Sequence, residues 1–533
     1  MEEKELVQDQ GGSILNNPTF YIALIITVAF VLFGILFTDT AESWMGSIFN
    51  FMIEYFGWSF ILFVSIFLLL ILFLLVSPLG GIRLGKDDEK PEYPLFTWFA
   101  MLFSCGMGIG LIFWGVSEPI WHYMWPPLGE AYEAGTIHVA MRYSIFHWGF
   151  HPWAIYAVVA GALSYFSYRK GLPMMLSSTL EPILGKKGID GGWGILVNVI
   201  GVFATLFGLA TSLGLGAMQI GNGLERLFGI TSGSGTWVTI VIVVTAAAVV
   251  STITGIDRGI KNLSRLNIVI AITLLVLVFI FGPTLFILNL FTHSTGEYLQ
   301  NIVHMSFGLD AAGEGTEGWY GAWTIFYWAW WLAWAPFVGT FIARVSRGRT
   351  IRTFVVGVLL VPTLVSIVWF SVFGGAALYE EHFGAGGIAD AVAESSEAGF
   401  FEALSLLPAS QLLIFVGMIS VAIFFITSSD SGTYVNGMLT SRGMLNPPFQ
   451  LRVTWGVVEG AIASILLFTG GLSALQTASI IGGFPFMILM ILMVYCLFKA
   501  LYQEMQTGSL PVERARIYEA IKDLKAEGKT DKL

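Results

Sequence analysis

The residues with the most specific chemistry in this chain are tryptophans gathered in one apolar segment. Four of them fall within seven residues of the stretch 321–342: Trp328, Trp330, Trp331 and Trp334. Membrane helices usually carry tryptophan at the lipid headgroups, so a group at mid-helix needs another explanation. In an ideal helix Trp330, Trp331 and Trp334 share one face. A wall of buried indoles suits a quaternary ammonium ion, which has no N–H to donate and binds through the ring quadrupole.

A second aromatic group, Trp148, Trp153 and Tyr156, surrounds Pro152 in the stretch 139–166. Proline removes a backbone hydrogen bond and kinks a helix, which changes the faces that converge. Taken alone, this group is explained equally well by core or interface packing. Its occurrence beside a second tryptophan group favours one shared site for a methylated ammonium compound.

Alternating glycines, Gly106, Gly108 and Gly110, interrupt another apolar stretch, which continues to Glu118 and Pro119. The spacing of four between the outer two is typical of close helix packing in membranes. The spacing of two instead favours an unwound segment, because each glycine costs about 1 kcal/mol of helix stability against alanine. Broken helices at the membrane midplane free backbone groups for substrates and ions in transporters.

Polar residues also lie deep in the stretch 411–436, where Thr427 and Ser428 precede Asp430. Such groups are costly inside a membrane and often mark an ion path, although hydroxyls also cap helix carbonyls. His147 and His151 have the spacing of a metal-binding pair. Because no third ligand is near them in sequence, packing histidines are the favoured interpretation.

The elements that must position these residues are membrane helices. The chain is 56% hydrophobic and 12% charged, and apolar runs long enough to cross a bilayer recur along it. We predict an all-α integral membrane protein with twelve transmembrane helices. The spans are 19–38, 57–77, 95–116, 139–166, 191–222, 236–254, 266–290, 320–343, 354–378, 411–436, 453–469 and 474–501.

The distribution of Lys and Arg supports this count and predicts the orientation. Connections after even-numbered spans are basic, whereas the opposite connections contain a single basic residue, Arg226. The positive-inside rule then places both termini in the cytoplasm. We expect a tail at 1–18, a transporter domain at 19–502 and a second tail at 503–533. The net charge of −10 reflects acidic outer loops and indicates no nucleic-acid partner. Both cysteines lie inside spans and suggest neither disulfide nor metal site.

Three motifs resemble signatures of the betaine/choline/carnitine transporter (BCCT) family. They are GMGIGLIFWGVSEP at 106–119, HWGFHPWAIY at 147–156 and WAWWLAWAPF at 328–337. The resemblance implies two inverted five-helix repeats, spans 3–7 and 8–12, preceded by two extra helices. It also implies a homotrimer in the plasma membrane, among its lipids, that takes up trimethylammonium compounds. An amphipathic stretch at 296–308 would lie on the outer surface.

The resemblance further implies roles for individual residues. An aromatic box would consist of Trp148, Trp153, Tyr156, Trp330, Trp331 and Trp334, with Trp328 on another side of its helix. Backbone N–H groups of Gly106, Gly108 and Gly110 would reach the substrate carboxylate. A sodium site would use oxygens of Ser104, Met107, Phe424, Thr427 and Ser428. A second sodium site would use Thr205, but Leu209 stands where relatives have another threonine.

These features favour sodium-driven import of a zwitterionic quaternary ammonium osmolyte, glycine betaine first. Proton-coupled choline carriers of the family place Asp where this chain has Gly110. Alternatives are a sodium-independent carnitine/betaine exchanger, although no Arg or Met replaces the ions between 198 and 217, or a proton-coupled choline or ectoine carrier. No cofactor other than the coupling sodium is expected. A channel or a membrane enzyme is disfavoured, because bulky tryptophans obstruct a pore and no convergent catalytic set is apparent.

Overall fold

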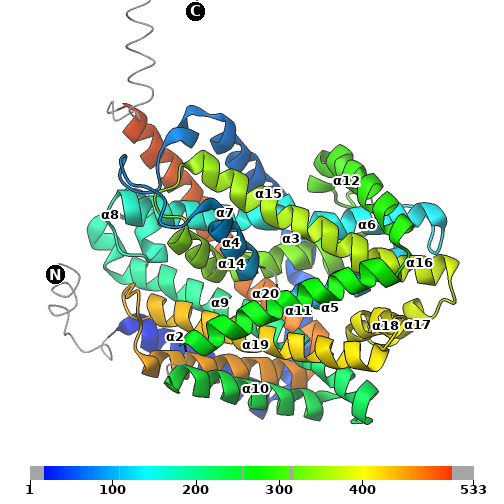
Figure 1. The fold of residues 1–533 in the computed structure, drawn as a ribbon. Helices are drawn as coiled ribbons and strands as arrows, with labels where there is room; N and C mark the ends of the chain where they lie inside the picture. Colours follow the sequence, from blue (N-terminus) through cyan, green and yellow to red (C-terminus); the bar gives the residue numbers. More distant parts are fainter. Residues whose placement is uncertain (1–16, 107, 255–256, 313–315, 507–533) are drawn as a thin grey trace, which may run out of the picture.

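The computed structural model describes residues 17–106, 108–254, 257–312 and 316–506, and it is helical throughout (Figure 1). No strand occurs in these ranges, only an isolated bridge between Arg83 and Thr350. Helices are the expected answer to a bilayer, because each backbone N–H and C=O must find a partner within the chain. Both predicted tails lie almost wholly outside the described residues.

Nineteen α-helices form the described part of the chain. They are α2 (Pro18–Leu36), α3 (Thr38–Val76), α4 (Leu95–Gly106), α5 (Ile109–Met124), α6 (Ala134–Trp148), α7 (Phe150–Ser164), α8 (Glu181–Ile189), α9 (Gly192–Phe228), α10 (Ser234–Thr254), α11 (Asp257–Phe281), α12 (Thr284–Ser306), α13 (Glu317–Tyr320), α14 (Phe326–Val345), α15 (Ile351–Trp369), α16 (Gly375–Phe383), α17 (Ile388–Glu394), α18 (Gly399–Ser405), α19 (Ser410–Leu439) and α20 (Phe449–Gln506).

Seven stretches of helix in the described residues are long and apolar enough to cross a membrane, or eight if a bent pair is counted as one. The chain is therefore an all-α, multi-span membrane protein, as predicted. The count of twelve is not reproduced as such. The third and fourth predicted spans are each divided into two short helices, and the last two are joined in α20.

Two turns of the chain explain how predicted and observed helices differ. Within α20, Gly471 has φ 54° and ψ −130°, a conformation open to glycine alone, and it lies where a connection was predicted. The predicted seventh span, 266–290, is wrong at its end. There α11 stops at Phe281 and α12 leaves at 110°. The predicted amphipathic stretch is thus part of a longer helix, which packs on α6 and α16 at the edge of the molecule (Figure 1).

Helix α14, which carries the tryptophan group, lies inside the bundle. It packs against α7, α9 and α20, and every residue from Phe326 to Thr340 is buried. Helix α4 also packs on it, and Gly110 in the first turn of α5 lies against Trp330. This arrangement places the predicted site residues of four separate spans around one centre.

Polar contacts between connections occur in two groups, one at each end of the bundle. At one end Arg83 donates to the Gly348 carbonyl at 2.9 Å, and Arg169 pairs with Asp87 at 2.8 Å. At the other, Arg226 pairs with Glu402 at 2.6 Å. The predicted even-numbered connections thus meet one another, as the alternation of spans requires.

Candidate functional site

Six aromatic rings from two spans form a continuous cluster, which we call the ring cluster. Its members are Trp148, Trp153, Tyr156, Trp330, Trp331 and Trp334, each at most 4% exposed. Trp330 and Trp331 stack with centroids 4.7 Å apart, and Trp148 meets Trp331 edge-on at 4.8 Å. Tyr156 joins Trp331 at 6.4 Å and Trp153 at 5.5 Å. The structure therefore brings together all six residues of the predicted aromatic box.

Backbone carbonyls hold the α14 rings in place. The indole N–H of Trp334 donates to the Gly208 carbonyl of α9 at 2.8 Å, and Trp330 approaches the same oxygen at 3.4 Å. Trp331 donates to the His147 carbonyl at 2.9 Å. Because a buried indole N–H needs an acceptor, these bonds fix the ring orientations.

The fourth span breaks at Gly149, not at Pro152 as predicted. Gly149 has φ −93° and ψ −136°, and α7 begins one residue later. Pro152 lies in the first turn of α7, where backbone N–H groups have no partner within the helix, so the N–H that proline lacks is not needed there. Tyr298 of α12 instead accepts from the Phe150 N–H at 2.9 Å. The break separates Trp148 from Trp153, so the two approach the cluster from different helices.

The third span breaks as predicted, and the break adjoins the ring cluster. Helix α4 ends at Gly106 and α5 begins at Ile109. A Cβ at Gly110 would lie 2.6 Å from Cη2 of Trp330 and 3.0 Å from Cη2 of Trp148, so only glycine fits against these rings. The N-terminus of α5, with its partial positive charge, therefore abuts the rings.

The other side of the break faces α19. A Cβ at Gly108 would lie 3.7 Å from Ser428 Oγ and 3.9 Å from Phe424 Cδ1. Thr427 Oγ1 donates to the carbonyl of Ile423 at 3.0 Å or of Phe424 at 3.2 Å. Two residues of the predicted sodium site, Phe424 and Ser428, thus lie beside the break, and Thr427 lies on the same helix. Met107 lies outside the described residues, as does the side chain of Ser104.

At the predicted second sodium site, Leu209 stands one turn after Thr205 in place of a second threonine. Thr205 is buried, and its Oγ1 donates to the Gly201 carbonyl at 2.8 Å. Leu209 fills the space against α19, where a Cβ at Gly432 would meet its Cδ1 at 2.1 Å. An apolar side chain therefore occupies the place of the expected oxygen ligand.

Glu118 is the residue that the sequence analysis left without a role. Its side chain is fully buried, and Oε2 accepts from Trp148 Nε1 at 2.8 Å and from the Tyr327 hydroxyl. The available signal was a carboxylate inside an apolar span, which is costly and usually functional. Through Trp148, this carboxylate orients one ring of the cluster.

The two histidines of the fourth span separate in space. His151 bonds to Ser306 Oγ at 2.9 Å and stacks on Trp328, which takes no part in the ring cluster. His147 instead contacts Glu118 at 2.7 Å, near His122. No third potential ligand is near His147 in sequence, as noted above, but the fold brings Glu118 and His122 of α5 to it.

Comparisons with known proteins identify the family of this chain. The family model described as "BCCT, betaine/carnitine/choline family transporter" matches residues 18–506. The chain is 47% identical to the glycine betaine transporter OpuD of Bacillus subtilis, over 92% of this chain and 95% of that protein. It is 44% identical to a glycine betaine transporter of Acinetobacter baylyi, over 91% and 73% of the two chains. An ectoine/hydroxyectoine transporter of Virgibacillus pantothenticus is 40% identical, over 90% and 96%. The chain belongs to the betaine/carnitine/choline transporter family.

Proposed function

We propose that this protein imports glycine betaine, or a closely related zwitterionic quaternary ammonium osmolyte, across the plasma membrane by sodium-driven alternating access. The observation that carries the proposal is the ring cluster beside the break of the third span. A desolvated cation–π contact contributes about 2 kcal/mol or more, so several rings can offset the dehydration of a trimethylammonium group.

A zwitterion uses both parts of this site. Its ammonium group would lie among the rings, and its carboxylate would accept hydrogen bonds from free N–H groups around Gly108 and Gly110 at the start of α5. Helix N-termini are suited to anions because their first N–H groups have no intrahelical partner. Relatives named for glycine betaine support this substrate class.

An ectoine relative supports a second candidate substrate. The ectoine/hydroxyectoine transporter shares 40% of its residues with this chain over nearly the full length of both. Competition between labelled betaine and unlabelled ectoine will rank the two compounds.

Sodium coupling rests on the oxygens beside the break. The Phe424 carbonyl and the hydroxyls of Thr427 and Ser428 are hard ligands of the kind that sodium requires, and Gly108 approaches two of these residues. One ion would then bind next to the substrate carboxylate. The apolar Leu209 argues against a second ion near Thr205. We further propose a homotrimer with both termini in the cytoplasm.

Uptake of radiolabelled betaine into proteoliposomes tests the proposal. We expect accumulation with an inward sodium gradient and none when potassium replaces all sodium. Equal uptake in both salts would overturn sodium coupling. Uptake that stops at equilibrium under every gradient would indicate a channel or exchanger, and a preference for choline over betaine would overturn the zwitterion assignment.

A further inference from the structure

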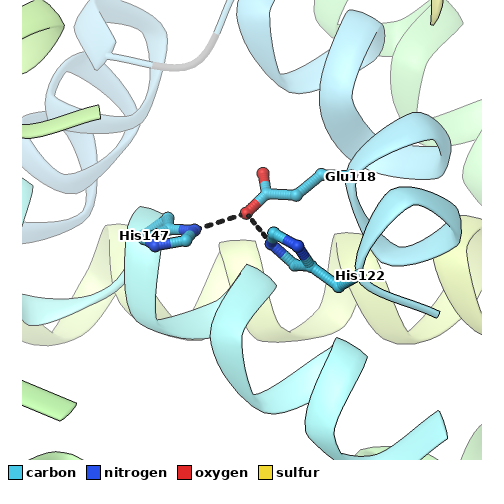
Figure 2. Close-up of side chains that lie close together, drawn as sticks. All are labelled: Glu118, His122 and His147. Carbon is cyan, nitrogen blue, oxygen red and sulfur yellow. Dashed lines mark hydrogen bonds and ion pairs between the residues drawn. The ribbon is translucent and has the colours of Figure 1, made fainter. Parts of the chain in front are cut away.

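Three fully buried side chains meet beside the ring cluster, and none of them is proposed to contact substrate or sodium (Figure 2). Glu118 and His122 lie one turn apart on α5, and His147 comes from the last turn of α6. Glu118 Oε1 is 2.7 Å from His147 Nδ1 and 3.3 Å from His122 Nε2. The three atoms lie within 4.8 Å of one another.

Hydrogen bonds from neighbouring side chains fix the orientation of the Glu118 carboxylate and of the His147 ring. Trp148 and Tyr327 both donate to Oε2 of Glu118, which leaves Oε1 alone facing the two imidazoles. On the far side of its ring, His147 Nε2 bonds to Thr324 Oγ1 at 2.9 Å. Metal-binding histidines and carboxylates are commonly fixed by outer partners of this kind.

Two imidazoles and one carboxylate are a ligand set for zinc and similar first-row divalent ions. Such an ion binds N and O at about 2.0–2.2 Å, which separates tetrahedral ligand atoms by about 3.3 Å. The observed separations from Oε1 are 2.7 and 3.3 Å, so small outward shifts admit an ion. Sodium and magnesium prefer sets made of oxygen alone and would not compete.

We propose that Glu118, His122 and His147 bind a divalent transition-metal ion such as Zn²⁺, and that the bound ion inhibits uptake. The ion would replace the hydrogen bonds between Oε1 and the two rings, with the His147 proton carried on Nε2 toward Thr324. Because Oε2 bonds to Trp148, the ion would bring positive charge next to a ring proposed to hold a cation. Binding is independent of the proposed function, whereas inhibition rests on it.

Metal binding is measured on the purified full-length protein in detergent. After removal of metals by chelation, the protein is dialysed against Zn²⁺, and bound metal is counted by mass spectrometry. Co²⁺ serves as a second probe, because its visible spectrum reports coordination geometry. We expect one ion per chain and at least tenfold weaker binding in His122→Gln and His147→Gln. The first is the milder variant, since Glu118 is the only partner of His122 among its described hydrogen bonds and ion pairs.

Two control variants distinguish this site from other histidines. His151→Gln removes a buried histidine of α7 that bonds to Ser306 and lies outside the group of three. His138→Gln breaks a separate histidine pair, whose ring centroids lie 4.0 Å apart. Both should bind Zn²⁺ like the wild type. Binding that is lost in the controls, or equal in wild type and the His122→Gln/His147→Gln double variant, would overturn the site.

Inhibition is measured separately, as betaine uptake with and without Zn²⁺, each variant against its own zinc-free rate. We expect Zn²⁺ to slow the wild type and to have little effect on His122→Gln. Stoichiometric binding without inhibition would overturn the inhibitory role alone. Zinc binding in a protein that takes up no betaine would overturn the proposed transport and leave the metal site standing.

Discussion

At the scale of single residues, the ring cluster depends on hydrogen bonds from indole N–H groups to backbone carbonyls. Trp331 is central, because it contacts Trp148, Tyr156 and Trp330 while its N–H is engaged with a backbone carbonyl. In the proposed site the ammonium group would therefore interact with the Trp331 ring and not with its N–H. Removing the ring should remove affinity for the ammonium group without removing a polar contact of the substrate.

Trp331→Leu should weaken betaine binding by roughly 30-fold, which corresponds to about 2 kcal/mol for one desolvated cation–π contact. Calorimetric titration of the purified protein will measure the dissociation constant. Trp193→Leu is the matched control, because Trp193 is 64% exposed and far along the chain from the cluster. Equal affinity of Trp331→Leu and wild type would contradict a substrate role for the rings.

Gly110 permits a paired experiment on selectivity. Any side chain there must displace Trp330 and Trp148, so both Gly110→Ala and Gly110→Asp should reduce betaine uptake, by tenfold or more. Only the aspartate adds a negative charge near the cation. Since opposite charges attract strongly in a low-dielectric site, choline uptake should appear in Gly110→Asp and rise with pH. Choline uptake by Gly110→Ala as well would show that space and not charge decides selectivity.

At the scale of elements, local sequence predicted breaks only where their cause is local. The alternating glycines correctly marked the gap between α4 and α5. The break between α6 and α7 was assigned to Pro152, but it lies at Gly149. The Tyr298 hydroxyl, from a helix distant in sequence, accepts from the Phe150 N–H beside it, which the local sequence does not show. For the same reason Glu118 went unassigned, since its partners come from α5, α6 and α14. The types and spacing of the aromatic residues, by contrast, can be read directly from the sequence, and all six predicted rings lie in one cluster.

The contact between the α4–α5 break and α19 predicts the ion dependence of transport. Thr427→Ala with Ser428→Ala removes two hydroxyl oxygens, so the sodium concentration for half-maximal uptake should rise at least tenfold. Uptake into proteoliposomes over a series of sodium concentrations will show it. Thr433→Ala removes a hydroxyl that bonds its own helix at the Asp430 carbonyl, and it should behave like wild type. An unchanged sodium dependence in the double variant would place the ion elsewhere.

At the scale of the whole molecule, one end of the bundle is held by a charged group between distant parts of the chain. Glu504, near the end of α20, accepts from the Tyr165 hydroxyl at 2.7 Å and pairs with Arg169 and Lys170. Arg169 also pairs with Asp87, from the connection before α4. The Arg169 and Glu504 side chains are 10% and 6% exposed, so loss of the Glu504 carboxylate leaves a largely buried Arg169 paired only with the half-exposed Asp87 among its described ion pairs.

Glu504→Ala should therefore destabilise the protein by about 3 kcal/mol and lower its melting temperature in detergent. Glu89→Ala is the control at the same end, because its partner Arg347 is 49% exposed and such surface pairs contribute about 0–1 kcal/mol. Differential scanning fluorimetry on both variants will compare them. Similar losses would mean that Glu504 contributes no more than a surface charge.

The Gly208 carbonyl limits how substitutions can alter the ring cluster during evolution. Two ring N–H groups converge on one oxygen, and that oxygen belongs to the backbone. No codon change at position 208 removes it, while a Cβ there would meet Trp334 at 2.6 Å and the α14 backbone at 3.0 Å. Ring orientation is thus shielded from most single substitutions. If the rings bind substrate as proposed, inherited changes in substrate selectivity are expected mainly at the small residues that contact the rings. The backbone oxygen that holds Trp330 and Trp334 would remain in place.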